Sequence, residues 1–130
     1  MRVMEGHTDP VWTVDWDSAC KTAVSGSWDT TIKQWDLGSG RCVETYQCGA
    51  VAAQVIMHES GSSFLSLDVM YTEDGDAIAE FKAWAMGCGT PLMRVPIGCF
   101  GDISMTANSD LSCVVVCAAV QDAFNVKVWK

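Results

Sequence analysis

A tryptophan-ended segment recurs along this chain and constrains its fold more than any other feature. The three copies end at Trp35, Trp84 and Trp129, which are 49 and then 45 residues apart. In each copy a lysine stands two residues before the tryptophan, and an apolar residue directly precedes that lysine. A spacing kept this closely indicates an internal repeat, in which each period stacks on its neighbours to bury its apolar face.

A second sequence feature recurs with the same spacing. Gly38-Ser39-Gly40 follows Trp35 at the offset at which Gly87-Cys88-Gly89 follows Trp84. We therefore predict a single domain of three repeats, at approximately residues 5–47, 48–99 and 100–130.

Within the first period, short runs of strand-forming residues alternate with polar turns. The expected strands are Val11–Trp16, Thr22–Ser27, a third that ends at Trp35, and residues 41–46. Residues 76–86 also fit a helical period, but they follow the turn signal Asp74-Gly75, so we predict a strand there. The sequence as a whole predicts an all-β chain.

The first period, residues 6–36, resembles a WD repeat. Gly6-His7 stands near its start and Trp35-Asp36 at its end, with a segment close to the family's usual one at residues 24–33. The resemblance implies a partial β-propeller of about three four-stranded antiparallel blades. The later periods match by spacing only, because both lack the histidine and carry Ala85 and Lys130 where the aspartate is expected.

The resemblance also implies a structural tetrad, formed by His7, Ser25, Asp29 and Trp35, with Ser27 as the alternative serine. A buried aspartate must be paired, and a histidine held by Asp and Ser can in turn meet the indole N–H. In the later periods the candidate turn acids are Asp74 or Asp76, and Asp122. Lacking the histidine, those blades are expected to hold together by packing alone.

In the family, partner proteins dock on the top face of the propeller, and the matching positions here are Asp9, Trp12 and Trp28. An exposed tryptophan is a typical interface anchor. Two alternatives stay open for Trp12, exposure or burial between adjacent blades, whereas Trp28 is expected to be exposed. Trp16 ends its strand and is expected in the core.

Three other side chains have simpler expected roles. His58 is expected on the surface, at the end of a strand. Lys33 and Lys82 are expected either in solvent or over an indole ring.

Composition excludes several functional classes. Sixteen acidic and eight basic residues give a net charge of −8, which repels a phosphate backbone and argues against nucleic acid as a partner. The acids are scattered, which favours a generic solvated surface over a dedicated site for a basic partner. No apolar run is long enough to span a bilayer, and no apolar segment typical of a secretion signal follows Met1.

The seven cysteines are an odd number in a chain without a visible secretion signal, so we expect reduced thiols in the cytoplasm or nucleus. Cys113 and Cys117 fall on one face of a strand but roughly 13 Å apart, which is too far to share a metal. We expect these two to be buried apolar filler, and we expect neither metal nor cofactor.

No motif points to catalysis. Ser25-Gly26-Ser27 lacks the flanking glycines of a nucleophile elbow, and no phosphate-binding glycine loop is present. We therefore predict a non-enzymatic scaffold or adaptor that binds other proteins. The alternative is a fragment of a longer multidomain WD-repeat protein whose signalling or enzymatic function lies elsewhere.

Propellers of this type have about four to eight blades, whereas this chain supplies about three. Residues 2–4 are a candidate outer strand that would complete the third blade. Exposed apolar flanks are then expected at both ends. Either these flanks meet the missing blades of a longer protein, or two chains pair into a six-bladed ring.

Overall fold

The structure is a computed structural model that describes residues 3–74, 77–100, 103–120 and 123–129; side chains at 98–100, 117–127 and 129 lie outside the description. Within those ranges every regular element is a β-strand, and all pairings are antiparallel. The predicted all-β fold is confirmed. Among the described residues no helix is long and apolar enough to cross a membrane.

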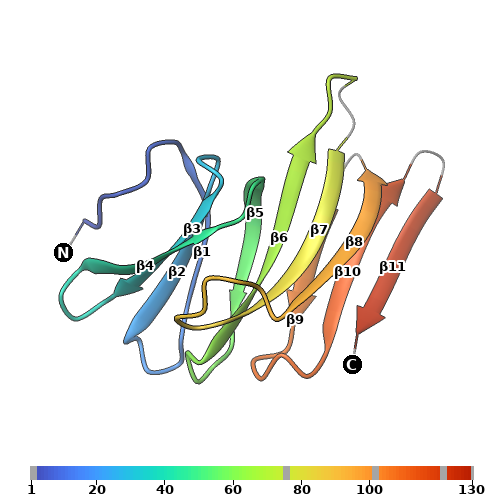
Figure 1. The fold of residues 1–130 in the computed structure, drawn as a ribbon. Coiled ribbons are helices and arrows are strands. Elements are labelled where there is room, and N and C mark those ends of the chain that lie inside the picture. Colours follow the sequence, from blue (N-terminus) through green and yellow to red (C-terminus); the bar gives the residue numbers. More distant parts are fainter. Residues whose placement is uncertain (1–2, 75–76, 101–102, 121–122, 130) are drawn as a thin grey trace.

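Eleven strands form three sheets that follow one another along the chain (Figure 1). The first sheet contains β1 (Val11–Trp16), β2 (Thr22–Ser27), β3 (Thr31–Asp36) and β4 (Arg41–Gln47). The second contains β5 (Val51–Met57), β6 (Ser63–Tyr71), β7 (Ala77–Ala85) and β8 (Met93–Phe100). The third contains β9 (Ile103–Ala107), β10 (Val114–Val120) and β11 (Ala123–Trp129).

β7 settles the ambiguous segment near residues 76–86. It is an extended strand that pairs with β6 and β8. Its buried residues alternate along most of its length, because successive side chains of a strand point to opposite faces. The strand interpretation is confirmed for the part of that segment that the structure describes; Asp76 lies outside it.

Two apolar clusters hold the sheets face to face. The cluster between the first and second sheets contains Val24, Ile32, Tyr46, Cys48, Ala52, Val55, Met57, Phe64 and Trp84. The cluster shared by the second and third sheets contains Leu65, Leu67, Val69, Ala77, Ala79, Phe81, Ile97, Met105, Val114 and Val116. The second sheet therefore packs against a sheet on both faces, and the first packs against a described sheet on one face only.

The first and second sheets share the same irregularities. A register shift falls at Trp12 in the pairing of β1 with β2, and another falls at Ala53 in the pairing of β5 with β6. A bulge adds one unpaired residue and re-aims its side chain. β1 and β5 also lie side by side, since the amide of Val55 donates to Thr13 Oγ1 and that of Met57 donates to Asp15 Oδ2.

The expectation that Trp16 belongs to the core is wrong: its side chain is 55% exposed. Thr13 and Asp15 point toward the second sheet, so Val14 and Trp16 point to the opposite face of β1. No described sheet packs on that face. The sequence shows the alternation of β1 but not which side a neighbour covers.

The predicted strand at residues 2–4 is not found. Val3 and Met4 are outside any strand, and Arg2 lies beyond the described residues. The third sheet accordingly has three described strands, one fewer than the four that we expected.

Candidate functional site

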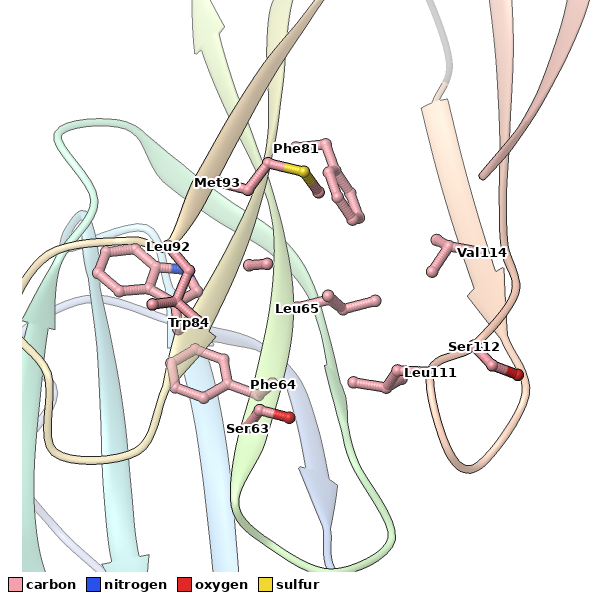
Figure 2. A pocket seen from close by; sticks show the side chains of 11 residues that line it. Ser63, Phe64, Leu65, Phe81, Trp84, Leu92, Met93, Leu111, Ser112 and Val114 are labelled. Atoms are coloured by element: carbon pink, nitrogen blue, oxygen red, sulfur yellow. The ribbon is translucent and has the colours of Figure 1, made fainter. Parts of the chain in front are cut away.

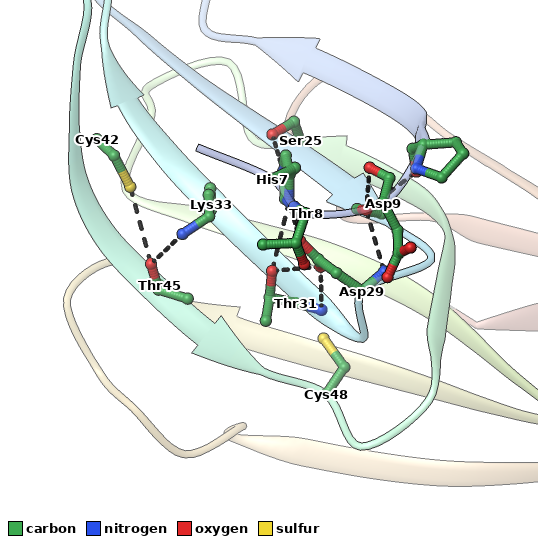
Figure 3. A network of polar contacts seen from close by, with 12 residues as sticks. His7, Thr8, Asp9, Ser25, Asp29, Thr31, Lys33, Cys42, Thr45 and Cys48 are labelled. Carbon is green, nitrogen blue, oxygen red and sulfur yellow. Dashed lines mark hydrogen bonds and ion pairs between the residues drawn. The ribbon is translucent and has the colours of Figure 1, made fainter. Parts of the chain in front are cut away.

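The structure brings together the four side chains proposed for the tetrad. Figure 3 shows three of them, His7, Ser25 and Asp29. His7, from the loop before β1, contacts Asp29 Oδ2 through Nδ1 and Ser25 Oγ through Nε2, each at 2.7 Å. Ser25 Oγ also accepts a hydrogen bond from the Trp35 indole N–H at 2.8 Å. The chain of contacts ties the N-terminal loop to β2, to the turn after it and to β3.

Asp29 is the most heavily bonded residue of this network. The Thr31 hydroxyl and amide donate to Oδ1 at 2.6 and 2.9 Å, and the Thr8 amide donates to Oδ2 at 3.2 Å. Desolvation by burial raises the pKa of Asp29, but the donors of Thr31, His7 and Thr8 outweigh it and lower the pKa from 3.8 to about 2. The carboxylate therefore stays ionised in the folded protein at neutral pH.

Ser27, the alternative serine, occupies a different place. Its hydroxyl lies 3.1 Å from the Asp9 carbonyl oxygen and 3.0 Å from that of Pro10, and it accepts from the Asp29 amide. Ser27 thus binds the backbone of the residues just before β1, whereas Ser25 contacts His7 and Trp35.

The second sheet has a polar network of its own, so the expectation that it is held by packing alone is wrong. The Trp84 indole N–H donates to Ser66 Oγ at 2.9 Å, as Trp35 does to Ser25. Lys82 Nζ lies 2.7 Å from Asp68 Oδ2 and donates to the Cys48 carbonyl at 2.8 Å. The second sheet therefore contains a buried ion pair beside its tryptophan–serine hydrogen bond.

Lys82 is 3% exposed, so the expectation that it lies in solvent is wrong. The alternative position, over an indole ring, agrees with the structure, because the Lys82 ammonium lies 6.0 Å from the centre of the Trp84 ring. Lys33 is half-buried and donates to Thr45 Oγ1 at 3.0 Å. The two equivalent lysines therefore have different environments.

Asp68, which the sequence analysis missed, is 1% exposed. Desolvation by burial raises the pKa of Asp68 to about 6, although Lys82 and Ser66 act in the opposite direction. Its Oδ1 has no hydrogen-bond partner among the described residues. A signal existed in the sequence: an aspartate inside the apolar run of residues 64–70 must find a partner, and a lysine precedes the next tryptophan.

Of the remaining candidate turn acids, the structure describes only Asp74. Asp74 is exposed in the turn after β6, whereas Asp76 and Asp122 lie outside the described residues. Trp129 ends β11, but its side chain also lies outside them.

Trp12 and Trp28 form an exposed aromatic pair. Trp12 is 62% exposed and Trp28 49%, their ring centroids are 5.6 Å apart, and the rings are tilted by 35°. Of the two alternatives for Trp12, the structure therefore shows exposure. Asp9, also exposed, stands just before β1, where the Trp28 amide donates to the carbonyl of Pro10.

The pair lies at the end of the sheets at which β1 and β5 begin, which we call the top end (Figure 1, upper side). β6 ends and β7 begins at the same end, with exposed Met70, Tyr71 and Ile78. The exposed acids of these loops are Glu5, Asp9, Glu73 and Asp74. The top end thus combines apolar side chains with negative charge.

A separate cavity of about 290 Å³ lies between the second and third sheets (Figure 2). Phe64, Phe81, Leu92 and Met93 line one side, and Leu111 and Val114 approach from the third sheet and the turn before it. No titratable side chain lines it, so this space belongs to the packing of the two sheets.

The other candidate residues lie apart from both sites. His58 is half-buried after β5 and bonds Ser60. Cys113 is only half-buried, so the expectation of a buried filler is wrong for it; it precedes β10 in a turn rather than standing within the strand. The Cys117 side chain lies outside the described residues. In the part of the chain that is described, no three His, Cys, Asp or Glu side chains are placed to hold a metal.

Comparisons with known proteins agree with this architecture. Residues 1–36 match the family model described as "WD domain, G-beta repeat". Similar proteins are eukaryotic translation initiation factor 3 subunit I of Saccharomyces cerevisiae, 36% identical over 64 residues, and of Meyerozyma guilliermondii, 40% identical over 63. The same subunit of Mycosarcoma maydis is 39% identical over 61 residues.

These matches cover 49%, 48% and 47% of this chain and 18% of each relative, so the shared segment spans less than a fifth of the relatives' length. The family match includes the residues of the His7 network, and the three sheets follow one another as propeller blades do. Residues 1–36 therefore match one WD repeat, and the three sheets, which follow one another along the chain, are consistent with the blades of a partial WD-repeat propeller.

Proposed function

We propose that this chain is a protein-docking scaffold that binds partner proteins at its top end, through Trp12, Trp28 and Asp9. The observation that carries the proposal is the paired, exposed state of the two indoles. Tryptophan supplies a large rigid contact area and keeps its N–H available to water or to a partner. Leaving two of them in solvent costs hydrophobic free energy, which a bound protein would recover.

The position of the pair separates it from the other exposed apolar residues. Trp28 stands in the turn that follows β2, and Trp12 stands at the register shift in β1, so both lie at one end of the first sheet. Both indoles are exposed although the second sheet is present.

The tetrad supports a structural role rather than a catalytic one for the histidine. Both ring nitrogens of His7 are engaged, one by Asp29 and one by Ser25, and the side chain is 4% exposed. A general base needs a nitrogen within reach of a substrate proton, which this arrangement does not offer.

The relatives suggest the kind of assembly. Their name describes a subunit of a eukaryotic translation initiation factor. We propose that this chain takes part in an assembly of that kind, in the cytoplasm. The family match at residues 1–36 contains the motif residues of the first sheet, which supports the proposal.

Affinity purification tests this proposal. The tagged chain would be incubated with a Saccharomyces cerevisiae extract, and subunits of initiation factor 3 would be quantified by mass spectrometry. We expect recovery by the wild type and at least about tenfold lower recovery by Trp12→Ala and Trp28→Ala, which remove anchor residues. Val43→Ala is the control for loss of an exposed apolar side chain, because Val43 is 52% exposed and stands on β4, at the other edge of the first sheet from β1. Equal recovery by all four proteins would contradict the proposed docking surface.

A second binding function rests on a different observation. Val14 and Trp16 are exposed on the face of the first sheet that no described sheet covers, next to the buried His7 network. A hollow of about 630 Å³ on that side is lined by Met4, Val11, Val14 and Trp35, among others. We propose that a further sheet packs here, supplied by a second copy of the chain or by additional blades.

A further inference from the structure

We infer that the Trp12–Trp28 pair is a receptor for an arginine side chain within a basic segment of the partner protein. This inference rests on the docking function proposed above and names the chemistry that the docking surface recognises. It is carried by the geometry of the two indoles and by the distribution of charge around them.

The aromatic pair offers the right surface for a guanidinium group. Two rings at 5.6 Å and 35° form an open wedge rather than a closed stack, and both rings are largely in solvent. A guanidinium is planar and weakly hydrated, so it lies on an indole face at a smaller desolvation cost than an ammonium. Tryptophan is the aromatic residue that binds cations most strongly.

The acids near the pair supply the complementary charge. Asp9 is adjacent through Pro10, Glu5 stands in the same loop, and Asp29 follows Trp28 directly. Asp29 stays ionised because its pKa is lowered to about 2. Glu73 and Asp74 extend the negative charge along the top end toward the second sheet.

The described cations do not neutralise this end. Lys21 stands in the β1–β2 turn and Arg41 at the start of β4, and both positions belong to the opposite end of the first sheet. Lys33, in the middle of β3, is half-buried and donates to Thr45. Lys82 is buried against Asp68, and Arg94 is paired with Glu80 at 2.6 Å. A basic segment would therefore meet net negative charge, whereas an acidic segment or nucleic acid would be repelled.

Peptide binding tests the inference. The probe is a fluorescent Gly/Ser peptide with three spaced arginines, and its binding to the whole chain is followed by anisotropy. The comparison peptide carries citrulline, which keeps the planar shape and removes the charge. We expect the citrulline peptide to bind about tenfold more weakly.

The variants locate the binding site. Trp12→Ala and Trp28→Ala should each weaken binding of the arginine peptide about tenfold, and Asp9→Asn should weaken it about threefold. Val43→Ala is the control for an exposed apolar side chain on β4, and Glu59→Gln is the control for an exposed acid at the opposite end; both should bind as the wild type does.

Three results would overturn the inference. Equal binding of the arginine and citrulline peptides would mean that apolar contact alone drives docking. Equal weakening by Val43→Ala and Trp28→Ala would mean that the peptide binds without a defined site. The third result is that neither peptide binds, while recovery of initiation factor subunits still depends on the two tryptophans. The arginine inference would then be wrong, and the proposed docking function would stand.

Discussion

His7 shows how a single side chain links distant parts of the first repeat. It bridges Asp29 and Ser25, and Ser25 passes the contact to the Trp35 indole. These four side chains are buried, so water could not replace a hydrogen-bond partner that a substitution removed. This network could be predicted from the sequence because the WD-repeat motif has its members at fixed spacings.

Replacing His7 should therefore lower the stability of the chain. His7→Ala leaves Asp29 and Ser25 without one partner each, which costs about 1–3 kcal/mol. Urea unfolding followed by circular dichroism measures the loss. His58→Ala is the matched control, because the His58 side chain bonds only a neighbouring exposed serine, and it should change stability by less than about 0.5 kcal/mol. Similar effects of the two substitutions would contradict a structural role for His7.

We expect Asp68 to make the stability of the chain depend on pH in the direction opposite to that of a carboxylate whose pKa is lowered by an ion pair. Its pKa in the folded chain is about 6, above the usual 3.8, so the folded state binds more protons than the unfolded state between these values. Stability contributed by Asp68 is therefore greatest below pH 4 and falls as the pH rises from about 4 to about 6. Asp68→Asn should flatten the stability curve in that window.

Asp29 acts in a separate window. Its folded pKa of about 2 lies below 3.8, so its contribution is complete above pH 4 and is lost as the pH falls toward 2. Unfolding midpoints measured from pH 2 to pH 7 separate the two groups. A wild-type curve that rises steadily from pH 4 to 6, and is unchanged in Asp68→Asn, would contradict the assignment for Asp68.

At the scale of the element, the positions of the strands could be predicted from the sequence more closely than which face of each strand is covered. The runs of strand-forming residues and the turn signals located β1, β2 and β7 closely. Whether Trp16 is covered depends on a neighbouring sheet, which no local pattern reports. The ion pair of Lys82 with Asp68 was missed for the same reason: the two residues stand on different strands, and only the register of β6 with β7 brings them together.

At Gly26 the first two sheets approach each other closely. A Cβ added there would lie 2.8 Å from the Ala52 Cβ and 2.8 Å from Thr13 Cγ2. Gly26→Ala should therefore force the sheets apart and destabilise the chain by about 1–3 kcal/mol. Gly89→Ala is the control, because a Cβ at that position meets nothing within 4 Å. Thermal unfolding compares the two; a Gly26→Ala protein as stable as Gly89→Ala would contradict this packing.

At the scale of the whole molecule, the sheets stack in one direction and the stack leaves an apolar flank. The second sheet is covered on both faces, whereas Val14 and Trp16 of the first sheet face solvent. The repeat spacing predicted successive sheets, and the WD motif predicted the network of the first. Neither predicted that the third sheet would show three described strands, because the later periods carry no motif to define their ends.

The central claim is that these sheets are propeller blades whose open flank requires a neighbouring sheet. Sedimentation equilibrium of the purified chain tests it most directly. We predict a mass above that of one chain, falling toward the monomer when Val14 and Trp16 are both replaced by Asn. A folded wild-type chain that remains monomeric up to about 100 μM, where even contacts of about 5 kcal/mol would be visible, would contradict the claim.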